Sequence, residues 1–543
     1  MGKETSAVEN ADIADRLEAF AALLELAGAS AFSIRAYRRA AELVRTTPAP
    51  VAELVRAGRV RELRGVGPGI ERRLRELVET GELAELRELE AELAPELVGL
   101  GRLVGVSASR MAAIGRALGI GTVAELREAA AAGRLRSVPG IGPRTEEKLR
   151  AGIREAGRRR PRRALLLNRA WALAGAIAEA LGGEVAGDPR RWKDASERLA
   201  VVVRARDAEP VLDRLESLPQ VVAVVERDRG RAVGVTVDGV PVEVVVAAPG
   251  RYGTELFRAT GPPELVAPLE PLPDAPDEET LFASLGLPLV PPELRDAGIA
   301  PPAGLLRPDD VRGDLHVHTT WSDGRASVLE MGQAARELGY EYLAICDHTR
   351  AVRVVPGLDA DDVRRQGEEI AAANEALAPF RVLRGAECDI LPDGSLDLPD
   401  DVLAELDWVQ VSLHAGQRAP RRELTARVVA AMRHPAARCL SHPTGRLINH
   451  RPPNALDLER VLEVALETGV ALEVNGLPDR LDLRDEHVRL AVDAGVPVVC
   501  STDAHSVRGL GNMRLAVATA RRGGAPAADV LNTRPLPEVL ASR

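Results

Sequence analysis

The sequence has few aromatic residues, very little lysine, no paired cysteines and no long apolar run. Of its 543 residues, only 13 are aromatic (5 Phe, 4 Trp and 4 Tyr), and only three of the 71 basic residues are lysine. No segment reaches the 18 or more apolar residues of a membrane-spanning helix, so none is predicted. The four cysteines stand singly, without a C-x-x-C pair or a signal peptide. This pattern favours a reduced compartment, and we expect a cytoplasmic protein.

Length and charge divide the chain into unlike parts. A chain of this length is expected to form three or four domains, and its 45% hydrophobic and 28% charged residues are typical of globular proteins. Residues 1–163 contain 29 basic and 23 acidic residues, so the net charge of −10 combines a basic first part with a strongly acidic remainder. All nine histidines lie beyond residue 310. We therefore expect different chemistry at the two ends.

Glycine-rich turns interrupt a helical N-terminal region. Residues 10–157 show apolar spacings of three and four, which predict helices throughout. Two interruptions share one form, LRGVGPGI at 63–70 and VPGIGPR at 138–144. A tight G-x-G turn exposes backbone N–H groups at a helix N-terminus, which can bind a phosphate without recognising a base. The structural alternative is an αα-hairpin whose glycines are only C-caps.

These turns resemble the helix-hairpin-helix motif of DNA-repair proteins, which implies binding to the DNA backbone. A middle copy at 97–118 has glycines but lacks the compact turn, so we expect weak binding or none there. The arginine-rich tract 158–163 either adds phosphate contacts or is a solvated linker. The predicted DNA-binding residues are Gly65, Gly67, Gly69, Gly140, Gly142, Arg144 and Lys148.

The middle of the chain has a mixed α/β pattern. After helix-hairpin-helix repeats, this pattern resembles the nucleotidyltransferase palm of bacterial family X DNA polymerases. Residues 261–280 are rich in proline and acidic residues and predict a linker. One helix is predicted at 169–181, and valine-rich strands are predicted at 199–205, 221–226, 232–237 and 240–247.

The resemblance to a polymerase palm fails at the metal-binding positions. That family has a G-S-x-R-R turn, a D-x-D pair on the next strand and a third acidic residue on a later strand, because two Mg²⁺ ions must be held. Here the turn is GDPRR, Arg198 and Ala200 replace the two aspartates, and Glu243 remains. An alternative alignment uses Asp194 and Glu197, but a spacing of three does not put both on one strand face. We predict that DNA polymerase activity is lost.

Repeated strand–helix units make up the C-terminal part. Beyond residue 311, seven short apolar strands are predicted, and most are followed by an amphipathic helix. Such units imply parallel strands in a closed or nearly closed barrel. The strands are predicted to end near His318, His348, Glu387, His414, His442, Asn475 and His505. The helices are predicted at 328–338, 360–376, 423–432, 457–468 and 485–494.

Residues able to bind metals follow nearly every one of these strands. The carboxyl ends of barrel strands meet at one rim, so residues far apart in the sequence are expected to converge there. A single histidine on a strand is more often a hydrogen-bonded core residue, but six of nine in equivalent positions indicate a metal site. Alternation in the H-x-H pair, His316 and His318, directs both imidazoles to one strand face. No role is assigned to His434, His450 and His487.

The C-terminal pattern resembles the polymerase and histidinol phosphatase (PHP) superfamily. Four fragments between 313 and 505 carry the resemblance: GDLHVHTTWSDG, GAECDI, SHPTG and STDAH. It implies three divalent metal ions, and mixed imidazole and carboxylate ligands suit Mn²⁺ or Zn²⁺. The resemblance assigns His316, His318, Glu387 and Asp503 to the first ion, Glu387, His414 and His442 to the second, and Asp323, His348 and His505 to the third.

The same resemblance implies roles in catalysis. Asp314 and Asp347 are expected either to orient histidines or to form core hydrogen bonds. Three arginines after strand ends, Arg350, Arg353 and Arg446, either contact substrate phosphates or lie in solvent. The implied catalytic residues are His316, His318, Glu387, His414 and Asp503.

These features predict a multidomain DNA-processing enzyme. The predicted function is a DNA-binding, metal-dependent phosphoesterase, a 3′–5′ exonuclease in DNA repair that acts at gaps, nicks or 3′ ends. We expect a monomer in the bacterial cytoplasm, associated with the nucleoid. The alternatives are a small-molecule phosphatase of the histidinol-phosphatase type and a non-catalytic DNA-binding repair scaffold. The predicted domains are an all-α helix-hairpin-helix region at 1–157, a degenerate palm-like α/β domain at 164–260, a reduced thumb or linker at 261–310, and a distorted (β/α)7 barrel of the PHP type at 311–543.

Overall fold

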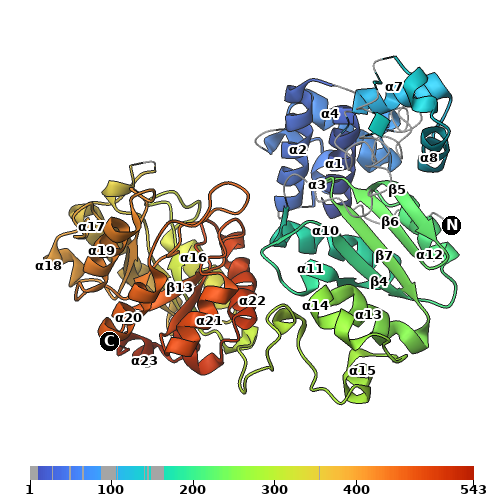
Figure 1. Cartoon of the computed structure of the whole chain (residues 1–543). Helices are drawn as coiled ribbons and strands as arrows, with labels where there is room; N and C mark the ends of the chain where they lie inside the picture. Colours follow the sequence, from blue (N-terminus) through green and yellow to red (C-terminus); the bar gives the residue numbers. More distant parts are fainter. Residues whose placement is uncertain are drawn as a thin grey trace, which may run out of the picture.

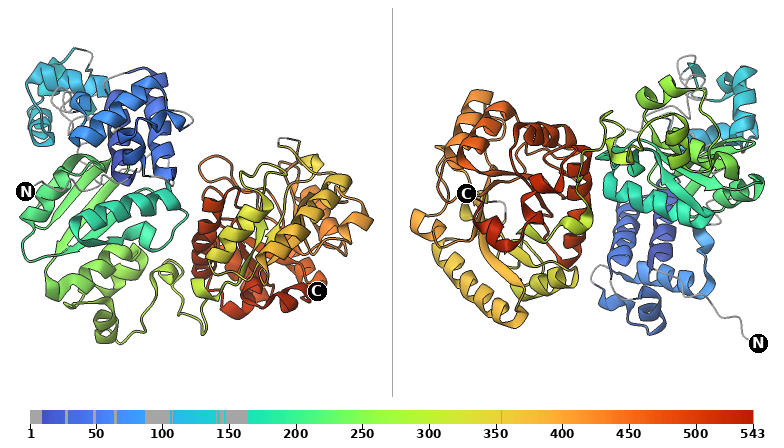
Figure 2. Two further views of the ribbon diagram at one scale, coloured as in Figure 1. Left: turned by 180° about the vertical axis from the view of Figure 1, so that it is seen from behind. Right: turned by 90° about the horizontal axis from the view of Figure 1, so that it is seen from below.

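The computed structural model describes residues 10–542, except 27–28, 48–49, 64–65, 87–105, 107, 140, 143–145, 148–163 and 354. Helices of the N-terminal part lie on a middle β-sheet, and the C-terminal part forms a barrel (Figure 1, Figure 2). The architecture is therefore the one predicted: an all-α region, a mixed α/β domain and a parallel barrel. Within these residues, no helix is both long and apolar enough to cross a membrane.

The described part of the N-terminal region is helical, as predicted. Side-chain caps explain where two helices begin: Ser30 accepts the Ser33 N–H at the start of α2, and Thr122 and Glu125 form a reciprocal capping box at the start of α8. The helices are α1 (Asn10–Leu26), α2 (Ala31–Thr46), α3 (Val51–Arg56), α4 (Pro68–Thr80), α7 (Ala108–Leu118) and α8 (Val123–Ala131).

The middle domain is a five-stranded mixed sheet with the predicted helix and the four predicted strands. The strand order is β2-β4-β7-β6-β5, in which β4 and β7 are parallel and the other neighbours are antiparallel. The strands are β2 (Gly183–Ala186), β4 (Leu199–Arg204), β5 (Val221–Asp228), β6 (Arg231–Thr236) and β7 (Pro241–Ala247), with the short pair β1 (Leu165–Leu166) and β3 (Ala195–Ser196). The helices are α10 (Leu167–Leu181), α11 (Gly187–Arg190), α12 (Glu209–Glu216) and α13 (Tyr252–Thr260).

The helical region packs directly on this sheet. Val233 of β6 shares a buried apolar cluster with Met111 of α7 and Leu126 of α8. At another point of the contact, Gln220 donates a buried hydrogen bond of 2.9 Å to Asp15 of α1. The N-terminal helices and the middle sheet therefore form a continuous packed body.

The segment that follows the middle sheet is more ordered than its composition indicated. It contains α14 (Pro263–Val266) and α15 (Glu278–Ser284), and Phe257 of α13 packs edge-to-face on Phe282 of α15. Glu278 lies between the guanidinium groups of Arg190 and Arg295. Proline restricts the local backbone, but buried aromatic and ionic contacts with the middle domain still organise it.

The C-terminal part is a seven-stranded parallel barrel, as predicted. The strands follow sequence order around the sheet, and a parallel bridge between Val317 and Ala504 brings its first and last strands together. The strands are β8 (Gly313–Val317), β9 (Tyr342–Ile345), β10 (Arg381–Asp389), β11 (Trp408–Ser412), β12 (Cys439–Leu440), β13 (Ala471–Asn475) and β14 (Val498–Ser501). The helices are α16 (Val328–Glu337), α17 (Ala360–Leu377), α18 (Asp400–Leu403), α19 (Arg421–Met432), α20 (Leu458–Thr468), α21 (Asp485–Ala494), α22 (Met513–Arg522) and α23 (Leu536–Leu540).

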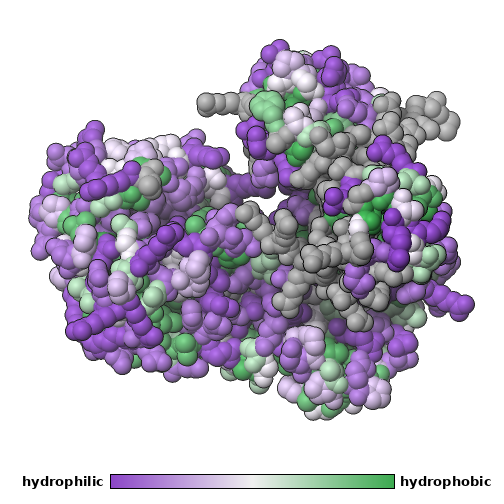
Figure 3. Space-filling view, turned by 45° about the horizontal axis from the view of Figure 1, so that its top comes forward, coloured by the Kyte–Doolittle hydropathy of each residue, from purple (hydrophilic) through white to green (hydrophobic). Residues whose placement is uncertain are grey.

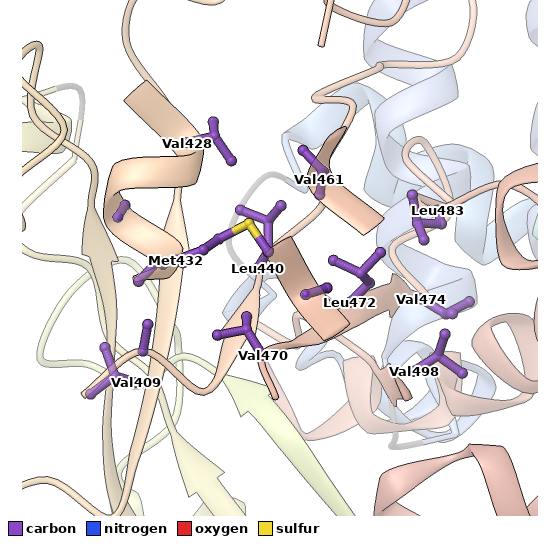
Figure 4. Packing of buried hydrophobic residues seen from close by; sticks show 14 of the residues in the cluster. Val409, Val428, Met432, Leu440, Val461, Val470, Leu472, Val474, Leu483 and Val498 are labelled. Carbon is purple, nitrogen blue, oxygen red and sulfur yellow. The ribbon is translucent and has the colours of Figure 1, made fainter. Parts of the chain in front are cut away.

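Apolar residues between strands and helices hold the barrel together. Figure 4 shows Met432 of α19 and Val461 of α20 directed toward Leu440 and Leu472 on the adjacent strands β12 and β13. All four side chains are buried. This packing fixes the strand ends, and with them the positions of the residues that follow each strand.

Ion pairs and an apolar cluster join the barrel to the middle domain. Arg446 was predicted either to contact a substrate phosphate or to lie in solvent. It does neither, because it pairs with Asp194 at 2.6 Å. Arg522 donates to the carbonyl of Arg191 in the middle domain at 2.7 Å and pairs with Asp296 of the segment that follows that domain at 2.9 Å. Leu167, Trp171 and Trp192 of the middle domain share a cluster with barrel residues, which are Ile448, Leu481 and Leu515.

Candidate metal centre

The nine predicted ligands gather at the carboxyl-terminal rim of the barrel. His316 lies on β8, and Glu387 lies on β10, where it forms a parallel bridge with His348. Each remaining ligand follows a strand within a few residues, because the strands end together at this rim. These remaining ligands are His318, Asp323, His414, His442, Asp503 and His505.

Glu387 lies at the centre of the group and is almost completely buried. Its two carboxylate oxygens face five imidazoles, which fits the bridging role that the resemblance implied. The distances from Oε2 are 2.8 Å to Nδ1 of His348, 3.6 Å to Nε2 of His316 and 3.7 Å to Nε2 of His318. Those from Oε1 are 2.8 Å to Nε2 of His442 and 3.4 Å to Nε2 of His414.

Two other carboxylates, Asp503 and Asp323, lie beside three of these imidazoles and beside His505. The distances from Asp503 Oδ1 are 3.1 Å to Nε2 of His318 and 4.0 Å to Nε2 of His316. Those from Asp323 are 3.2 Å to Nε2 of His505 and 3.8 Å to Nε2 of His348. Ligand atoms fall within 4.8 Å of one another in three groups, which are His318, Asp323, His348 and His505; His316, His318 and Asp503; and His348, Glu387 and His414.

Two buried carboxylates that sequence reasoning missed orient the ligand imidazoles. Nδ1 of His316 lies 2.6 Å from Glu473, and Nδ1 of His414 lies 3.1 Å from Asp389. A carboxylate that accepts from one ring nitrogen fixes the tautomer and directs the other nitrogen to a metal. The available signal was strand alternation, because Asp389 is two residues from Glu387 and therefore shares its face.

The two aspartates expected near the ligands form core hydrogen bonds, the second of their predicted alternatives. Asp314 accepts hydrogen bonds from the backbone and hydroxyl of Thr502. Asp347 accepts from the backbone and hydroxyl of Thr319 and from the amide of Gln366. Both therefore hold the loops that carry ligands, rather than hydrogen bonding to an imidazole.

Two predicted ligands have a left-handed backbone conformation that is unfavourable for residues other than glycine. The φ angles are 25° at His442 and 53° at Asp503. Such a conformation costs on the order of 1–3 kcal/mol and persists only where the surrounding structure enforces it. Here the backbone N–H of His442 donates to Glu473, and that of Asp503 donates to the His316 carbonyl. Strain at these positions is typical of functional sites.

Opposite charges at the centre shift the pKa of both partners. Burial alone raises the pKa of Glu387, but the charges of His414 and His348, with that of His316, hold it well below its usual range. Burial lowers the pKa of His414, yet Glu387 and Asp389 outweigh it and raise this pKa to about 10. Without metal, an ionised Glu387 therefore lies beside a protonated His414, whereas burial and the charge of His348 lower the pKa of His318 to about 4.

The donor set fits divalent metal ions. Imidazole nitrogens and carboxylate oxygens converge from separate strands, and Nδ1 of His318 is buried without a hydrogen-bond partner among the described residues. A buried polar atom without a partner is costly unless something binds it. Mixed nitrogen and oxygen donors are typical of Zn²⁺ and Mn²⁺ sites.

Metal affinity is expected to rise with pH, by about tenfold per pH unit for each ion between pH 7 and pH 9. Burial lowers the pKa of His316 and His505, but nearby carboxylates raise the first well above its ordinary value and the second to about 9. Each ligand set implied by the resemblance contains one such imidazole, His316, His414 or His505, which must lose a proton to bind metal. Calorimetric Mn²⁺ titration in buffers of different ionisation enthalpy measures proton release, and an affinity independent of pH would contradict the expectation.

The palm-like positions of the middle domain hold ion pairs in place of metal ligands. Ala200 on β4 is the register partner of Glu243 on β7, so the two positions do lie side by side. Arg198 pairs with Glu243 at 3.4 Å, and Arg231 pairs with the same carboxylate. Asp194 of the alternative alignment pairs with a barrel arginine. A single carboxylate neutralised by two guanidinium groups cannot hold two Mg²⁺ ions.

The described glycines of the two N-terminal turns do not act as C-caps. Gly67 is the N-cap of α4 with φ −86°, and a Cβ atom added at Gly67, Gly69 or Gly142 meets nothing within 4 Å. Left-handed C-cap glycines occur elsewhere, for example at Gly81 with φ 76°. At these three described positions no contact within the protein requires glycine, and the lack of a side chain there would allow a ligand to approach the backbone closely. Gly65, Gly140, Arg144 and Lys148 lie outside the described residues.

Comparisons with known sequences match all parts of this architecture. A helix-hairpin-helix domain matches residues 8–83, a SAM-like helix-hairpin-helix tandem matches 100–155, and a PHP domain matches 314–475. The DNA polymerase/3′-5′ exonuclease PolX of Bacillus subtilis (strain 168) is 32% identical over 98% of both chains. A probable phosphatase of Acetivibrio thermocellus is 30% identical over 35% of this chain and 78% of its own length. Because the similarity to PolX extends over nearly the whole length, the chain belongs to the bacterial PolX family.

Proposed function

We propose that this protein is a metal-dependent phosphoesterase that hydrolyses DNA from 3′ ends during repair. The observation that carries the proposal is the convergence of six imidazoles and three carboxylates at the barrel rim of a chain that also has helix-hairpin-helix domains. The full-length relative is named as a 3′-5′ exonuclease as well as a polymerase. A chain with this rim and backbone-binding turns is equipped to hold a strand and cleave it.

We assign the nine ligands to three ions, Mn²⁺ or Zn²⁺, in the sets that the PHP resemblance implies. The distances around Glu387, Asp503 and Asp323 support this assignment, although His348 also lies close to Glu387. Bound ions would lower the pKa of a water to give hydroxide near neutral pH and neutralise the charge of the phosphate oxygens. The chain contributes by directing ligand atoms: Glu473 orients His316, and Asp389 orients His414.

Replacement of His414 by alanine is expected to reduce Mn²⁺-dependent digestion of a 3′-labelled strand by about a hundredfold or more, because one ion loses a direct ligand. Denaturing gels of end-labelled single strands, gapped duplexes and nicked duplexes measure the effect and the preferred substrate. His434→Ala is the matched control. His434 follows the end of α19, away from the rim, and pairs with Asp400 of α18. Undiminished digestion by His414→Ala would disprove the site assignment.

A small-molecule phosphatase remains the second candidate function. Relatives named probable phosphatases cover 35–40% of this chain, at 27–30% identity. Phosphomonoesters and phosphodiesters can use the same metals, so the barrel alone does not distinguish them. Turnover of histidinol phosphate compared with that of DNA separates the two, and turnover of neither would favour a DNA-binding scaffold.

Replacing Gly67 and Gly142 by alanine is expected to weaken duplex binding by about tenfold or more while leaving stability unchanged. Added Cβ atoms meet no protein atom, but they would hinder charge-assisted hydrogen bonds between backbone N–H groups and a phosphate, worth about 1.5 kcal/mol or more. Fluorescence anisotropy measures affinity, and thermal unfolding measures stability.

Gly81→Ala provides the opposite control. Its left-handed conformation predicts that the substitution lowers stability by about 1–2 kcal/mol without directly weakening DNA binding. Equal affinity of the Gly67→Ala, Gly142→Ala variant and the wild type would argue against a role of these turns in DNA binding. We further propose a cytoplasmic, nucleoid-associated monomer, which gel filtration and cell fractionation test.

A further inference from the structure

Three arginines lie on consecutive loops of the barrel rim and have few partners among the described residues. Arg451 donates from Nε to the Gly445 carbonyl at 2.8 Å, and Arg480 lies near Asp503. Arg418 follows β11 and His414, Arg451 follows β12 and His442, and Arg480 follows β13 and Asn475. The loops after parallel strands lie at the same rim as the metal centre. The three guanidinium groups therefore come from successive positions around one sector of that rim.

Arg480 lies beside a predicted metal ligand, and two of its buried N–H groups have no hydrogen-bond acceptor in the part of the chain that the structure describes. Its Nε is 3.7 Å from Oδ2 of Asp503, the oxygen that also accepts a 3.0 Å hydrogen bond from Asn475. Nε and Nη1 of Arg480 are buried and have no hydrogen-bond partner among the described residues. Buried guanidinium donors without acceptors are costly, so this position favours a second anionic partner that can accept from them.

The other two arginines bring more positive charge to the same place. Burial and the charges of Arg480 and Arg418 lower the pKa of Arg451, with Asp482 opposing them, which means that the three cations are close enough to repel one another. Asp482 already accepts hydrogen bonds from the backbone and hydroxyl of Thr444. Three cations near two carboxylates, Asp482 and Asp503, that already accept other hydrogen bonds favour binding of a further anion.

We propose that Arg418, Arg451 and Arg480 bind the phosphodiester backbone of the DNA strand next to the metal centre, and so hold the strand while its 3′ end is cleaved. This inference rests on the proposed function. Guanidinium groups bind phosphate oxygens with strong, charge-assisted hydrogen bonds. Figure 3 shows a mainly hydrophilic surface with a hollow between the barrel and the N-terminal helices, where a strand held by both parts could lie.

Binding of a short single strand tests the cluster directly. The probe is a fluorescent pentanucleotide with phosphorothioate linkages, which resist cleavage, added to the full-length Mn²⁺-loaded protein. We expect Arg480→Gln and Arg451→Gln each to weaken its binding by about tenfold or more, and to reduce the slope of log K against log salt by about 0.7 for each phosphate that is no longer neutralised. Arg460→Gln is the control, because Arg460 is an exposed arginine paired with Glu463 on α20.

The outcomes separate this proposal from the proposed function. Unchanged pentanucleotide affinity and salt dependence in both variants would overturn the cluster, even if the wild type digests DNA. Loss of bound Mn²⁺ in Arg480→Gln would instead make Arg480 a positioning residue for Asp503; Arg451→Gln, which touches no ligand, then decides. Arginine-dependent binding by a protein that does not cleave DNA would support the cluster and refute the exonuclease.

Discussion

The Glu387→Gln variant is expected to lose Mn²⁺-dependent DNA hydrolysis by on the order of a thousandfold or more. Glu387 faces five of the six imidazoles at the rim, and the resemblance assigns it to two ions at once. Glutamine has nearly the same shape but no charge, so it cannot bridge two cations. Loss of metal that contributes several kcal/mol to transition-state stabilisation corresponds to this factor. Rates from single-turnover digestion of a 3′-labelled strand measure it.

Metal content and a surface control distinguish lost chemistry from lost structure. We expect Glu387→Gln to retain less Mn²⁺ than the wild type by elemental analysis, while circular dichroism stays native. Glu405→Gln changes a partly exposed glutamate in the same domain and is expected to leave both activity and metal content unchanged. Full activity of Glu387→Gln at saturating Mn²⁺ would contradict the bridging role.

The barrel and its ligands could be predicted because they depend on local patterns. Strand alternation, helix spacing and the position of a histidine after each strand are visible in single segments of sequence. His316 and His318 show this most clearly, since an H-x-H pair on a strand must direct both rings to one face. Convergence at a rim then follows from parallel βα topology.

Of the two carboxylates behind the ligands, Glu473 could not be predicted in the same way. Glu473 stands alone in an apolar strand, and only the fold shows that it meets His316, which is 157 residues away in sequence. The partner of Arg446 is likewise a middle-domain aspartate 252 residues away. Contacts between elements with no shared sequence pattern depend on how the elements and domains pack. This packing cannot be inferred from the patterns of a single sequence.

The arginines of the middle-domain turn illustrate the same limit. In a polymerase palm this turn is expected to bind a triphosphate, and Arg190 and Arg191 are retained here. In the structure Arg190 forms a two-point pair with Glu278, at 3.0 and 2.9 Å, and Arg191 pairs with Asp188 and Asp296. Removing such partners would leave charges uncompensated. The turn has therefore become part of the internal packing, through residues that the resemblance to a palm did not reveal.

Restoring the two missing acids is accordingly not expected to restore DNA synthesis. The wild type is expected to show no templated incorporation with Mg²⁺ or Mn²⁺, and the Arg198→Asp, Ala200→Asp variant is expected to gain metal binding beside Glu243 without extending a primer. Three carboxylates would then be present, but Arg190 and Arg191 would remain paired with acidic side chains and unavailable to the triphosphate. Primer extension with a known polymerase as positive control measures this.

Incorporation by the wild type would refute the loss of polymerase activity. Incorporation by the double variant alone would show that the missing carboxylates were the only defect and that the paired arginines are free to exchange partners.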